Sequence, residues 1–463
     1  MSDHRQPEVA LALSGLAAEL HASMAGLGIV SPHGHTDPAW FARDAAFANP
    51  AELLIQPDHY VFRMLYSRGV ALEALGLGGA AADPRDVFRI LAEHWHTFLG
   101  TPSHLWMADV LWRCFGIGER LRPENATEIY DRIAARIAEP DFRPRALLET
   151  FGIEVLATTD GALDDLAHHA AFAALGHGTR LIPTFRPDTV LNPAVPDFAA
   201  NIDALGAATD CDTGSYAGYL DALRQRRGHF AAHGATATDH DVPHLATEWL
   251  GQAGAEELFG RALKGGLSAD EATRLYGHLL IEMAQMSLDD GLVMQIHAGS
   301  RRGTNRAVEA QFGPNMGADI PHRTDWVGGL DGLPNRVGNR ADLTLIAFTL
   351  DESAYARELA PMAGHWPALR LGPPWWFHDS VNGILRYFDQ VVETAGYENL
   401  AGFNDDTRAF LSIPARHDLW RRAVALHLAA QVGRGVMGRE DARYLGVRLA
   451  RGLAIDAYRL GAS

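Results

Sequence analysis

Cysteine is almost absent from this chain of 463 residues, which contains only Cys114 and Cys211. Two cysteines exclude a disulfide framework and also a cysteine-rich zinc site. Histidine is far more frequent, with 22 residues. If the protein binds a metal ion, nitrogen and oxygen atoms must therefore hold it.

Long apolar runs and an excess of positive charge are also missing. No apolar segment approaches the roughly 18 residues that a membrane span needs, and residues 1–8 are polar, unlike a signal peptide. We therefore expect a cytoplasmic protein without a membrane partner. The formal net charge is −17, which argues against nucleic acid as a partner. A small acidic substrate remains compatible, because a few arginines in one pocket suffice to bind it.

Eight short, mostly apolar runs predict strands that are separated by helical stretches. The runs are 28–30, 153–157, 180–185, 234–239, 292–297, 343–348, 368–372 and 399–403. This α/β alternation is typical of a TIM-type (β/α)8 barrel, with a doubly wound open sheet as the alternative. The run 234–239 is the weakest, because Ala-Thr-Ala-Thr is hardly apolar. No Gly-x-Gly-x-x-Gly motif follows an early strand, which weakens the dinucleotide-binding form of the open sheet.

The predicted strands divide the chain into four parts. Leucines at helical spacing predict an N-terminal helical segment over residues 1–27, with the helix itself within 9–27. Residues 58–150 show helical spacing of Trp and Phe and no strand-like alternation, which predicts an inserted helical subdomain. Residues 28–57 would then hold the first strand with its loop, and residues 151–463 the rest of the barrel with C-terminal helices.

Ionisable side chains follow most of the predicted strands at their C-terminal ends, where a barrel carries its active site. The first strand runs into His33 and His35. Because residues i and i+2 of a strand point to one side, both imidazoles can reach one metal ion. A solvated turn explains an isolated His-x-His equally well. His297 at the fifth strand and Asp406 after the eighth favour a divalent ion such as zinc or manganese.

Arginines make a second case for a small acidic ligand. Arg63, Arg186, Arg302 and Arg408 lie beside the strand ends or in the helix that follows one. Each alone is explained by a solvated surface position. Together they would clamp a carboxylate, because a guanidinium matches it with two hydrogen bonds. Trp375 is typical of a core residue, and it would also suit the floor of a sugar pocket.

The sequence resembles uronate isomerases of the amidohydrolase superfamily in motifs whose order and spacing hold from about residue 28 to about residue 420. The motifs are Ser31-Pro32-His33-Gly34-His35-Thr36-Asp37-Pro38, Asp58-His59-Tyr60-x-x-Arg63, Thr158-Thr159-Asp160, Arg186-Pro187-Asp188, Gln295-Ile296-His297, Trp375-Trp376-Phe377 and Asp406-Thr407-Arg408-x-Phe410-Leu411-Ser412. The resemblance implies a metal-dependent hydrolase-like barrel. It also implies reversible aldose–ketose isomerisation of D-glucuronate to D-fructuronate and of D-galacturonate to D-tagaturonate.

The resemblance further implies a metal site and a proton-transfer pair. His33, His35 and Asp406 would hold a divalent ion, zinc or manganese, with His297 as a further ligand or a hydrogen-bond donor to the substrate. The ion would bind the oxygens at C1 and C2 of the open-chain sugar. Tyr60 and Asp406 would move protons. For Tyr60 to act as a base, its pKa would have to fall from its ordinary value near 10, through His59 and a cationic environment.

Other positions would bind the rest of the substrate. Arg186 and Arg408 would bind the carboxylate or position hydroxyl groups, Trp375 would wall the pocket and Asp239 would accept a sugar hydroxyl. The remaining expected substrate contacts are His59, Arg63 and Arg302. Whether the C2 hydrogen moves as a proton or as a hydride is left open by the residues.

Two positions depart from the family pattern. Asp241 stands where family members usually have glycine. This puts in doubt both the local loop and the role of His240. Arg301 competes with Arg302 for one matched position, and we favour Arg302.

Two rival functions use the same residues. A mononuclear hydrolase acting on a sugar-acid lactone or amide shares the fold, although such enzymes usually add a metal-bridging lysine or a second metal. No lysine follows any of the eight predicted strands. A non-catalytic sugar-acid binder would need the arginines and the tryptophan but not an intact His-x-His with Asp406. We expect a small hexuronate as the partner, and the number of subunits, including a homo-oligomer, is left open.

Overall fold

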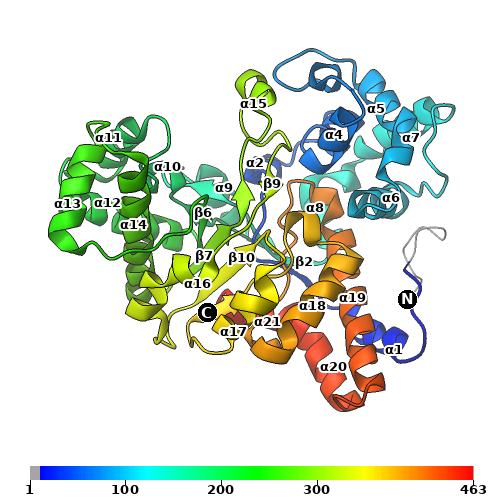
Figure 1. Cartoon of the computed structure of the whole chain (residues 1–463). Coiled ribbons are helices and arrows are strands. Elements are labelled where there is room, and N and C mark those ends of the chain that lie inside the picture. Colours follow the sequence, from blue (N-terminus) through cyan, green and yellow to red (C-terminus); the bar gives the residue numbers. More distant parts are fainter. Residues whose placement is uncertain (1–10, 462–463) are drawn as a thin grey trace.

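The computed structural model describes residues 11–461, and its strands form two parallel sheets and one short antiparallel pair (Figure 1). The strands are β1 (Ile29–Ser31), β2 (Ile153–Ala157), β3 (Asp160–Gly161), β4 (Arg180–Ile182), β5 (Phe185–Arg186), β6 (Ala237–Val242), β7 (Val293–Ala298), β8 (Ser300–Arg301), β9 (Ile320–Pro321), β10 (Leu345–Thr349) and β11 (Leu369–Leu371). One parallel sheet has the order β1-β2-β4 and the other the order β11-β10-β7-β6-β5-β3, while β8 pairs with β9.

The two parallel sheets continue into each other along two extended segments. One segment carries β2 and then β3, and the other carries β4 and then β5. Between them the Thr158 N–H donates to the Ile182 carbonyl and the Thr184 N–H donates to the Thr158 carbonyl, both at 2.9 Å. The segments pair with their neighbours in chain order, and every pair is parallel. The carboxyl ends of all these strands therefore face the same side.

Most of the expected strands form, but their limits shift. The run 153–157 is confirmed as β2, and 180–185 is split into β4 and β5 at Pro183, which has no N–H to donate. The run 234–239 was placed three residues too early, because β6 runs from Ala237 to Val242. The residues of β6 pair with those of β7 and are mostly buried. These tertiary contacts stabilise the strand in spite of its low apolar content.

The helices between β1 and β2 confirm that residues 58–150 are helical. They are α2 (Pro38–Arg43), α3 (Pro50–Leu54), α4 (His59–Tyr66), η1 (Leu72–Leu75), α5 (Pro84–Glu93), η2 (Trp95–Phe98), α6 (Pro102–Phe115), α7 (Ala126–Ile137), η3 (Pro140–Phe142) and α8 (Pro144–Thr150). Several begin with a proline in the first turn after a capping side chain, as Asp83 caps α5 and Thr101 caps α6. Figure 1 shows α4 to α7 standing together beside the sheets, and they share one apolar cluster.

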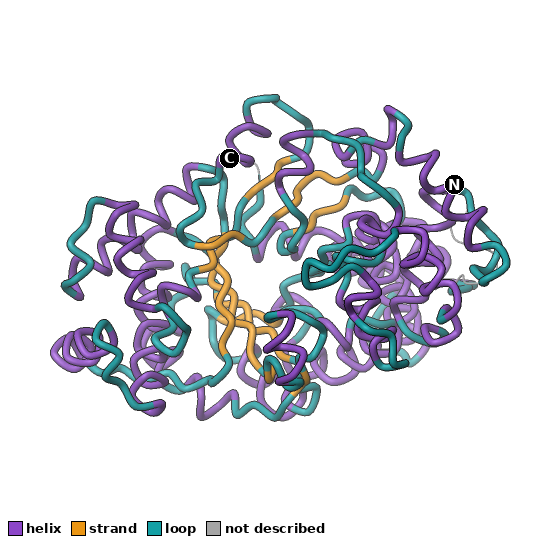
Figure 2. The backbone as a smooth tube through the Cα atoms, turned by 90° about the horizontal axis from the view of Figure 1, so that it is seen from above, coloured by secondary structure: helices purple, strands orange, loops and turns teal. Residues whose placement is uncertain are grey.

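The remaining helices surround the strands, which lie in the middle of the molecule (Figure 2). They are α1 (Gly15–Met24), α9 (Ala167–Ala173), α10 (Asp188–Leu191), α11 (Phe198–Thr209), α12 (Tyr216–Ala232), α13 (Gly251–Ala262), α14 (Ala269–Asp290), α15 (Arg306–Phe312), α16 (Trp326–Leu330), η4 (Pro334–Gly338), η5 (Tyr355–Leu359), α17 (Ala360–Ala363), η6 (Trp376–His378), α18 (Val381–Ala395), η7 (Tyr397–Asn399), η8 (Phe410–Ser412), α19 (Ile413–Gly433), α20 (Arg439–Val447), η9 (Arg448–Gly452) and α21 (Leu453–Ala457). The expected N-terminal segment 1–27 contains α1, and its residues 1–10 lie outside the described residues. No helix in the described part has the length and apolar character that crossing a membrane requires.

The expected eighth strand, 399–403, is wrong as a strand. The chain there makes one parallel bridge, between Leu371 and Leu400. Gly402 then adopts a φ of +79°, and a Cβ atom at this position would lie 2.5 Å from the backbone nitrogen of Ala454 in α21. The close approach of the C-terminal helix thus bends the chain out of the extended conformation after a single bridge.

Apolar side chains from the strands fill the space below the site. Val30, Ile182 and Val293 belong to one buried cluster, and α21 with Tyr458 closes it from the other end of the strands. The Tyr458 hydroxyl donates to the Oε1 atom of Gln295 at 2.9 Å. The strand ends above this cluster are therefore supported on packed side chains rather than on solvent.

Candidate active site

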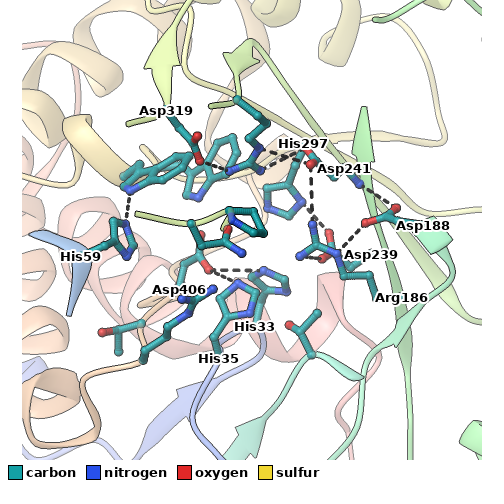
Figure 3. A pocket seen from close by; sticks show the side chains of 18 of the residues that line it. His33, His35, His59, Arg186, Asp188, Asp239, Asp241, His297, Asp319 and Asp406 are labelled. Atoms are coloured by element: carbon teal, nitrogen blue, oxygen red, sulfur yellow. Dashed lines mark hydrogen bonds and ion pairs between the residues drawn. The ribbon is translucent and has the colours of Figure 1, made fainter. Parts of the chain in front are cut away.

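A pocket of about 490 Å³ opens at the carboxyl ends of the parallel strands (Figure 3). All but one of the site residues expected from the sequence line it. These are His33, His35, His59, Tyr60, Arg186, Asp239, His297, Arg302, Trp375, Asp406 and Arg408. The structure therefore gathers side chains from β5, β6, β7 and α4, from the segments that follow β1, β8 and β11, and from the loop before η8 around one space.

Arg63 is the expected site residue that does not line the pocket. Its guanidinium lies over the ring of Phe377, 4.7 Å from the ring centre. Its side chain also packs beside Gly317, where a Cβ would lie 2.6 Å from the Cβ of Arg63. The cation thus lies on an aromatic ring, and Arg63 is not among the residues that line the pocket.

Backbone hydrogen bonds bring the first and last parts of the site together. The His35 N–H donates to the carbonyl of Thr407 at 3.0 Å, and the Asp406 N–H donates to the carbonyl of His33 at 3.3 Å. Asp406 has a φ of +42°, a left-handed conformation that non-glycine residues seldom adopt. Strained backbone of this kind is common where a side chain must be aimed at a functional centre.

Three side chains form a group that could hold a metal ion. Ligand atoms of His33, His297 and Asp406 all lie within 4.8 Å of one another. His35 stands beside this group, with its Nε2 atom 2.9 Å from an oxygen of Asp406. The Nε2 atom of His33 lies 3.5 Å from the same oxygen.

The donor atoms of this group fit a divalent cation. The Nε2 atom of His297 and the Oδ1 atom of Asp406 are buried, and no described residue hydrogen-bonds to either. The Nδ1 atom of His297 faces Oδ1 of Asp239 at 2.7 Å. A carboxylate this close to Nδ1 favours the tautomer with its proton on Nδ1, which leaves Nε2 free to bind a metal, as in the carboxylate–histidine pairs of metal sites. Nitrogen and oxygen donors of this kind suit a divalent ion.

Electrostatics keep the carboxylate of this group ionised. Burial raises the pKa of Asp406, but the close imidazoles of His33 and His35 outweigh it and hold that pKa well below its usual range. Burial lowers the pKa of His33, yet Asp239 and Asp406 outweigh it and the net change is upward. Burial dominates at His35, whose pKa is lowered.

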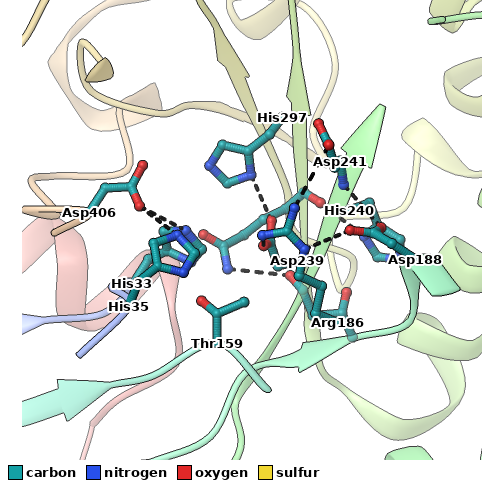
Figure 4. A network of polar contacts seen from close by, with 12 residues as sticks. His33, His35, Thr159, Arg186, Asp188, Asp239, His240, Asp241, His297 and Asp406 are labelled. Atoms are coloured by element: carbon teal, nitrogen blue, oxygen red, sulfur yellow. Dashed lines mark hydrogen bonds and ion pairs between the residues drawn. The ribbon is translucent and has the colours of Figure 1, made fainter. Parts of the chain in front are cut away.

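Arg186 is surrounded by three aspartates (Figure 4). Its Nε donates to Asp188 at 2.6 Å, and its Nη1 and Nη2 atoms lie 3.2 Å from Asp239 and 3.9 Å from Asp241. Burial lowers the pKa of Arg186, but these three carboxylates raise it by more, so the net change is upward. Burial raises the pKa of Asp188 to about 7. The guanidinium is therefore fixed in place and largely neutralised by protein carboxylates.

Arg302 is held in a similar way, which resolves the doubt about Asp241. Both oxygens of Asp241 accept from Arg302, at 3.2 Å and 3.0 Å, and Asp319 accepts from it at 3.0 Å. The guanidinium also lies 5.0 Å from a ring centre of Trp376. Arg301, the competing residue, is exposed in β8. Asp241 thus replaces the usual glycine with a carboxylate that anchors a pocket arginine.

Arg408 differs from the other two pocket arginines. Its side chain makes no hydrogen bond or ion pair with any described residue, although it is half-buried and lines the pocket. Burial lowers its pKa, and the nearby Asp406 only partly opposes this. A buried, unneutralised guanidinium is an expensive arrangement unless an anion joins it. Among these three pocket arginines, Arg408 is therefore the one whose side-chain N–H groups are all left for a ligand.

Tyr60 is positioned by the start of α4. Asp58 caps the helix by accepting from the Tyr60 N–H at 2.9 Å, and the His59 ring stacks on the Tyr60 ring with centres 4.7 Å apart. The Trp376 indole N–H donates to Nε2 of His59. These contacts fix the phenol at the edge of the pocket.

The lowered pKa that Tyr60 would need to act as a base is not found in the protein alone. Burial raises the pKa of Tyr60 well above its usual value, and Arg416 lowers it only in part. Burial also lowers the pKa of His59 to about 3, so this neighbour is neutral and supplies no positive charge. The phenol therefore keeps its proton at neutral pH.

Several pocket residues have no clear signal in the sequence. Asp319 pairs with Arg302 from β9's flanking loop, and only the pairing of β8 with β9 brings it there. Thr159 and Trp376 belong to the motifs quoted above, although neither was expected to contact the substrate. Asp319 could not have been found from the sequence, because nothing in its local sequence marks it.

Comparisons with known proteins were made with this geometry in hand. Residues 8–455 match the model of the family described as glucuronate isomerase. The uronate isomerase of Rhizorhabdus wittichii is 56% identical over 445 residues, which cover 96% of this chain and 95% of that protein. The uronate isomerase of Sphingopyxis alaskensis is 52% identical, with 96% of both chains covered.

Solved structures agree with these sequence matches. The glucuronate isomerase of Caulobacter crescentus superposes with a TM-score of 0.95 at 47% identity, covering 97% of this chain and 94% of the other. The uronate isomerase of Thermotoga maritima has a TM-score of 0.91 at 26% identity, covering 96% and 97%. The agreement extends over nearly the whole of each chain.

Proposed function

The chain belongs to the glucuronate isomerase family, and from this premise we propose how its pocket isomerises a hexuronate. It is an enzyme, a uronate isomerase. The two proposed reversible conversions are D-glucuronate to D-fructuronate and D-galacturonate to D-tagaturonate. One observation carries the proposal: a His/Asp group suited to a metal ion, an arginine that no described residue neutralises and a buried tyrosine line the same pocket.

The proposed scaffold is a TIM-type (β/α)8 barrel closed from eight parallel segments. The joined sheets support it, as does the Ala401 N–H, which donates to the carbonyl of Leu371 at 2.7 Å. The contact of His35 with Thr407 supports closure between the last segment and the first. On this proposal the parts are an N-terminal segment at 1–27, the first strand and loop at 28–57, an inserted helical subdomain at 58–150 and the rest of the barrel at 151–463. A cytoplasmic location stays a prediction.

The proposed metal ligands are His33, His35 and Asp406, with His297 as a fourth ligand. Three or fewer imidazoles with one carboxylate suit zinc, and manganese is the alternative. A bound divalent ion would polarise the oxygens at C1 and C2 of the open-chain sugar as a Lewis acid. Asp239 would keep the ring of His297 oriented for that role, because it faces Nδ1 at 2.7 Å.

Arg408 is proposed to bind the substrate through charge-assisted hydrogen bonds. Arg186 and Arg302 already have carboxylate partners at 2.6 Å and 3.0 Å, so they are proposed to offer their remaining N–H groups to sugar hydroxyls or to one carboxylate oxygen. Trp375 is proposed as an apolar wall, since it lines the pocket and its ring contacts that of His297.

Two residues are proposed to move protons in an enediol route. Asp406 is ionised and suits removal of the C2 hydrogen as a proton, while Tyr60 keeps its proton and suits donation to the oxygen at C1. Return of the first proton to C1, with the hydroxyl proton at O2 passing to Tyr60, completes the ketose. Atoms and charges balance, because each residue ends as it began.

Proton NMR of the protein with each uronate in deuterated water tests this function. We expect the matching ketose to appear when zinc is supplied, and deuterium at C1 would support the enediol route over hydride transfer. Lack of ketose from both sugars would overturn the proposal. The same samples would then be offered sugar-acid lactones and amides to test for hydrolysis.

A further inference from the structure

A buried cation lies behind the ring of Tyr60, outside the pocket itself. Arg416, in the first turn of α19, has its guanidinium carbon 5.4 Å from the Tyr60 ring centre and 3.5 Å from a ring centre of Trp106. Only 2% of Arg416 is exposed. Helix α6, which carries Trp106, thus holds the guanidinium against Tyr60 from behind.

The cation is only partly neutralised. Its Nη1 donates to Asp379 at 2.9 Å and its Nε donates to the hydroxyl of Ser412 at 3.0 Å. No described residue accepts a hydrogen bond from its Nη2, and none donates to Oδ1 of Asp379. Burial raises the pKa of Asp379 to about 7, in spite of Arg416. Near neutral pH, Asp379 is therefore partly protonated, and the pair carries a net positive charge.

We propose that the Arg416–Asp379 pair is a positioning pair for the isomerisation, which sets how readily the Tyr60 phenol gives up its proton. A buried ion pair adds little net stability compared with apolar packing. A charge within about 6 Å of an ionisable group, by contrast, changes its proton affinity strongly when water is excluded. Arg416 favours the phenolate and Asp379 opposes it.

Other charged groups also shift the pKa of this phenol, each in a known direction. The largest contributions come from Asp58, Asp379, Asp406 and Arg416. Arg63 of α4 adds a further attraction, and neutral His59 stacks on the ring. The three carboxylates raise the pKa of Tyr60 and Arg416 lowers it. Of the four largest contributors, Arg416 and Asp379 are the two that lie outside the pocket lining.

The test observes the phenol directly. The full-length protein is prepared with 3-fluorotyrosine at its 11 tyrosines, and fluorine NMR follows each resonance against pH with and without zinc. The Tyr60→Phe variant identifies the Tyr60 signal by its loss. Fluorine makes a phenol more acidic, which brings the titration closer to the pH range where the protein stays folded.

Two variants should move the Tyr60 midpoint in opposite directions. Arg416→Gln removes the positive charge and should raise the midpoint by about one pH unit, and Asp379→Asn removes the negative charge and should lower it. Arg416→Lys keeps the charge and should stay near the wild-type midpoint. A purely structural pair would give no such opposition. Shifts in the same direction, or none, overturn the proposal.

Arg421 supplies the matched control. It lies on α19, is buried, and donates to the carbonyls of Leu27 and Gly28. Arg421→Gln should leave the Tyr60 midpoint unchanged. If Arg421→Gln moves it as far as Arg416→Gln does, the effect is a general loosening of α19 and the proposal is wrong. If Arg416→Gln does not fold, Asp379→Asn and Arg416→Lys decide.

This inference rests on the proposed role of Tyr60, and the two can fail separately. When Tyr60 donates a proton, kcat should fall at high pH as the phenol ionises. That limb should move up in Arg416→Gln and down in Asp379→Asn. Wild-type activity in Tyr60→Phe would remove the role proposed for Tyr60. Loss of activity in Tyr60→Phe without opposed fluorine shifts would remove only the positioning pair.

Discussion

The Nδ1 atom of His297 lies 2.7 Å from a carboxylate oxygen of Asp239. The other oxygen of this carboxylate lies 3.2 Å from Arg186. One buried aspartate thus contacts both an imidazole of the proposed metal site and a guanidinium of the proposed substrate site. Burial raises the pKa of Asp239, but Arg186, His297 and His33 outweigh it and keep the group ionised.

Asp239→Asn keeps the shape of this side chain and removes its charge. We expect metal content or kcat to fall by about 10- to 100-fold, because His297 loses the partner that sets its proton and ring orientation. Metal analysis and kinetics check this. Asp342→Asn, at a surface ion pair with Arg340, is the matched control and should behave like wild type. Equal metal content and kcat in Asp239→Asn would show that the contact has no role.

Asp406→Asn should have the largest effect on turnover. Asparagine cannot take a proton from C2, and general base catalysis supplies about 10²- to 10⁴-fold. It is also a weaker metal ligand, so metal content should fall in parallel. Circular dichroism establishes that the fold is intact. A folded, metal-loaded Asp406→Asn protein with near-normal kcat would rule out the assigned base.

Arg408→Met and Arg302→Met should differ. Arg408 has no described partner, so its loss removes hydrogen bonds to the substrate, worth about 1.5–3 kcal/mol for a charged pair. KM for hexuronates should rise by about 10- to 100-fold. Arg302 is already bound to Asp241 and Asp319, so its loss should weaken binding less. Calorimetry with gluconate, and with sorbitol as the neutral control, checks which variant loses anion affinity. The reverse ranking would contradict the assignment.

Asp160→Asn should change how stability depends on pH. Burial raises the pKa of Asp160 from 3.8 to about 7. A carboxyl with a raised pKa stabilises the fold at low pH, and this contribution is lost as pH rises from about 4 to above 7. The penalty at alkaline pH reaches up to about 4 kcal/mol in the wild type. The variant should lack it.

Thermal unfolding at about pH 5 and about pH 8.5 measures this difference. The melting temperature of Asp160→Asn relative to wild type should be higher at the alkaline pH than at the acid one. Asparagine can still accept from Thr158, whose hydroxyl lies 2.7 Å from Asp160. The same difference at both pH values would show that Asp160 does not titrate with folding.

The sequence predicted the centre of the pocket well and its outer partners poorly. His33, His35 and Asp406 follow strand segments, where period-two geometry and strand order fix the side to which side chains point. Asp319 reaches Arg302 only because β8 pairs with β9. Such a contact depends on how a long excursion folds back, which local patterns do not encode.

Two further misses have the same physical origin. The extended run at 399–403 bends at Gly402 because α21 packs against it. The pKa of Tyr60 rises because the ring is buried, with 6% of the residue exposed. Both depend on neighbours distant in sequence. The sequence shows the residue types but not how much water remains beside them.

The hydrogen bond from the Asp406 N–H to the His33 carbonyl joins residues 373 positions apart. During synthesis, a chain that ends before this aspartate can present both histidines and still lack the carboxylate of the proposed ion site. On the proposed ligand set, ion binding would therefore wait for nearly the entire polypeptide. Because an ion that binds only the finished fold stabilises it by mass action, its binding would also hold the segment around Asp406 in place.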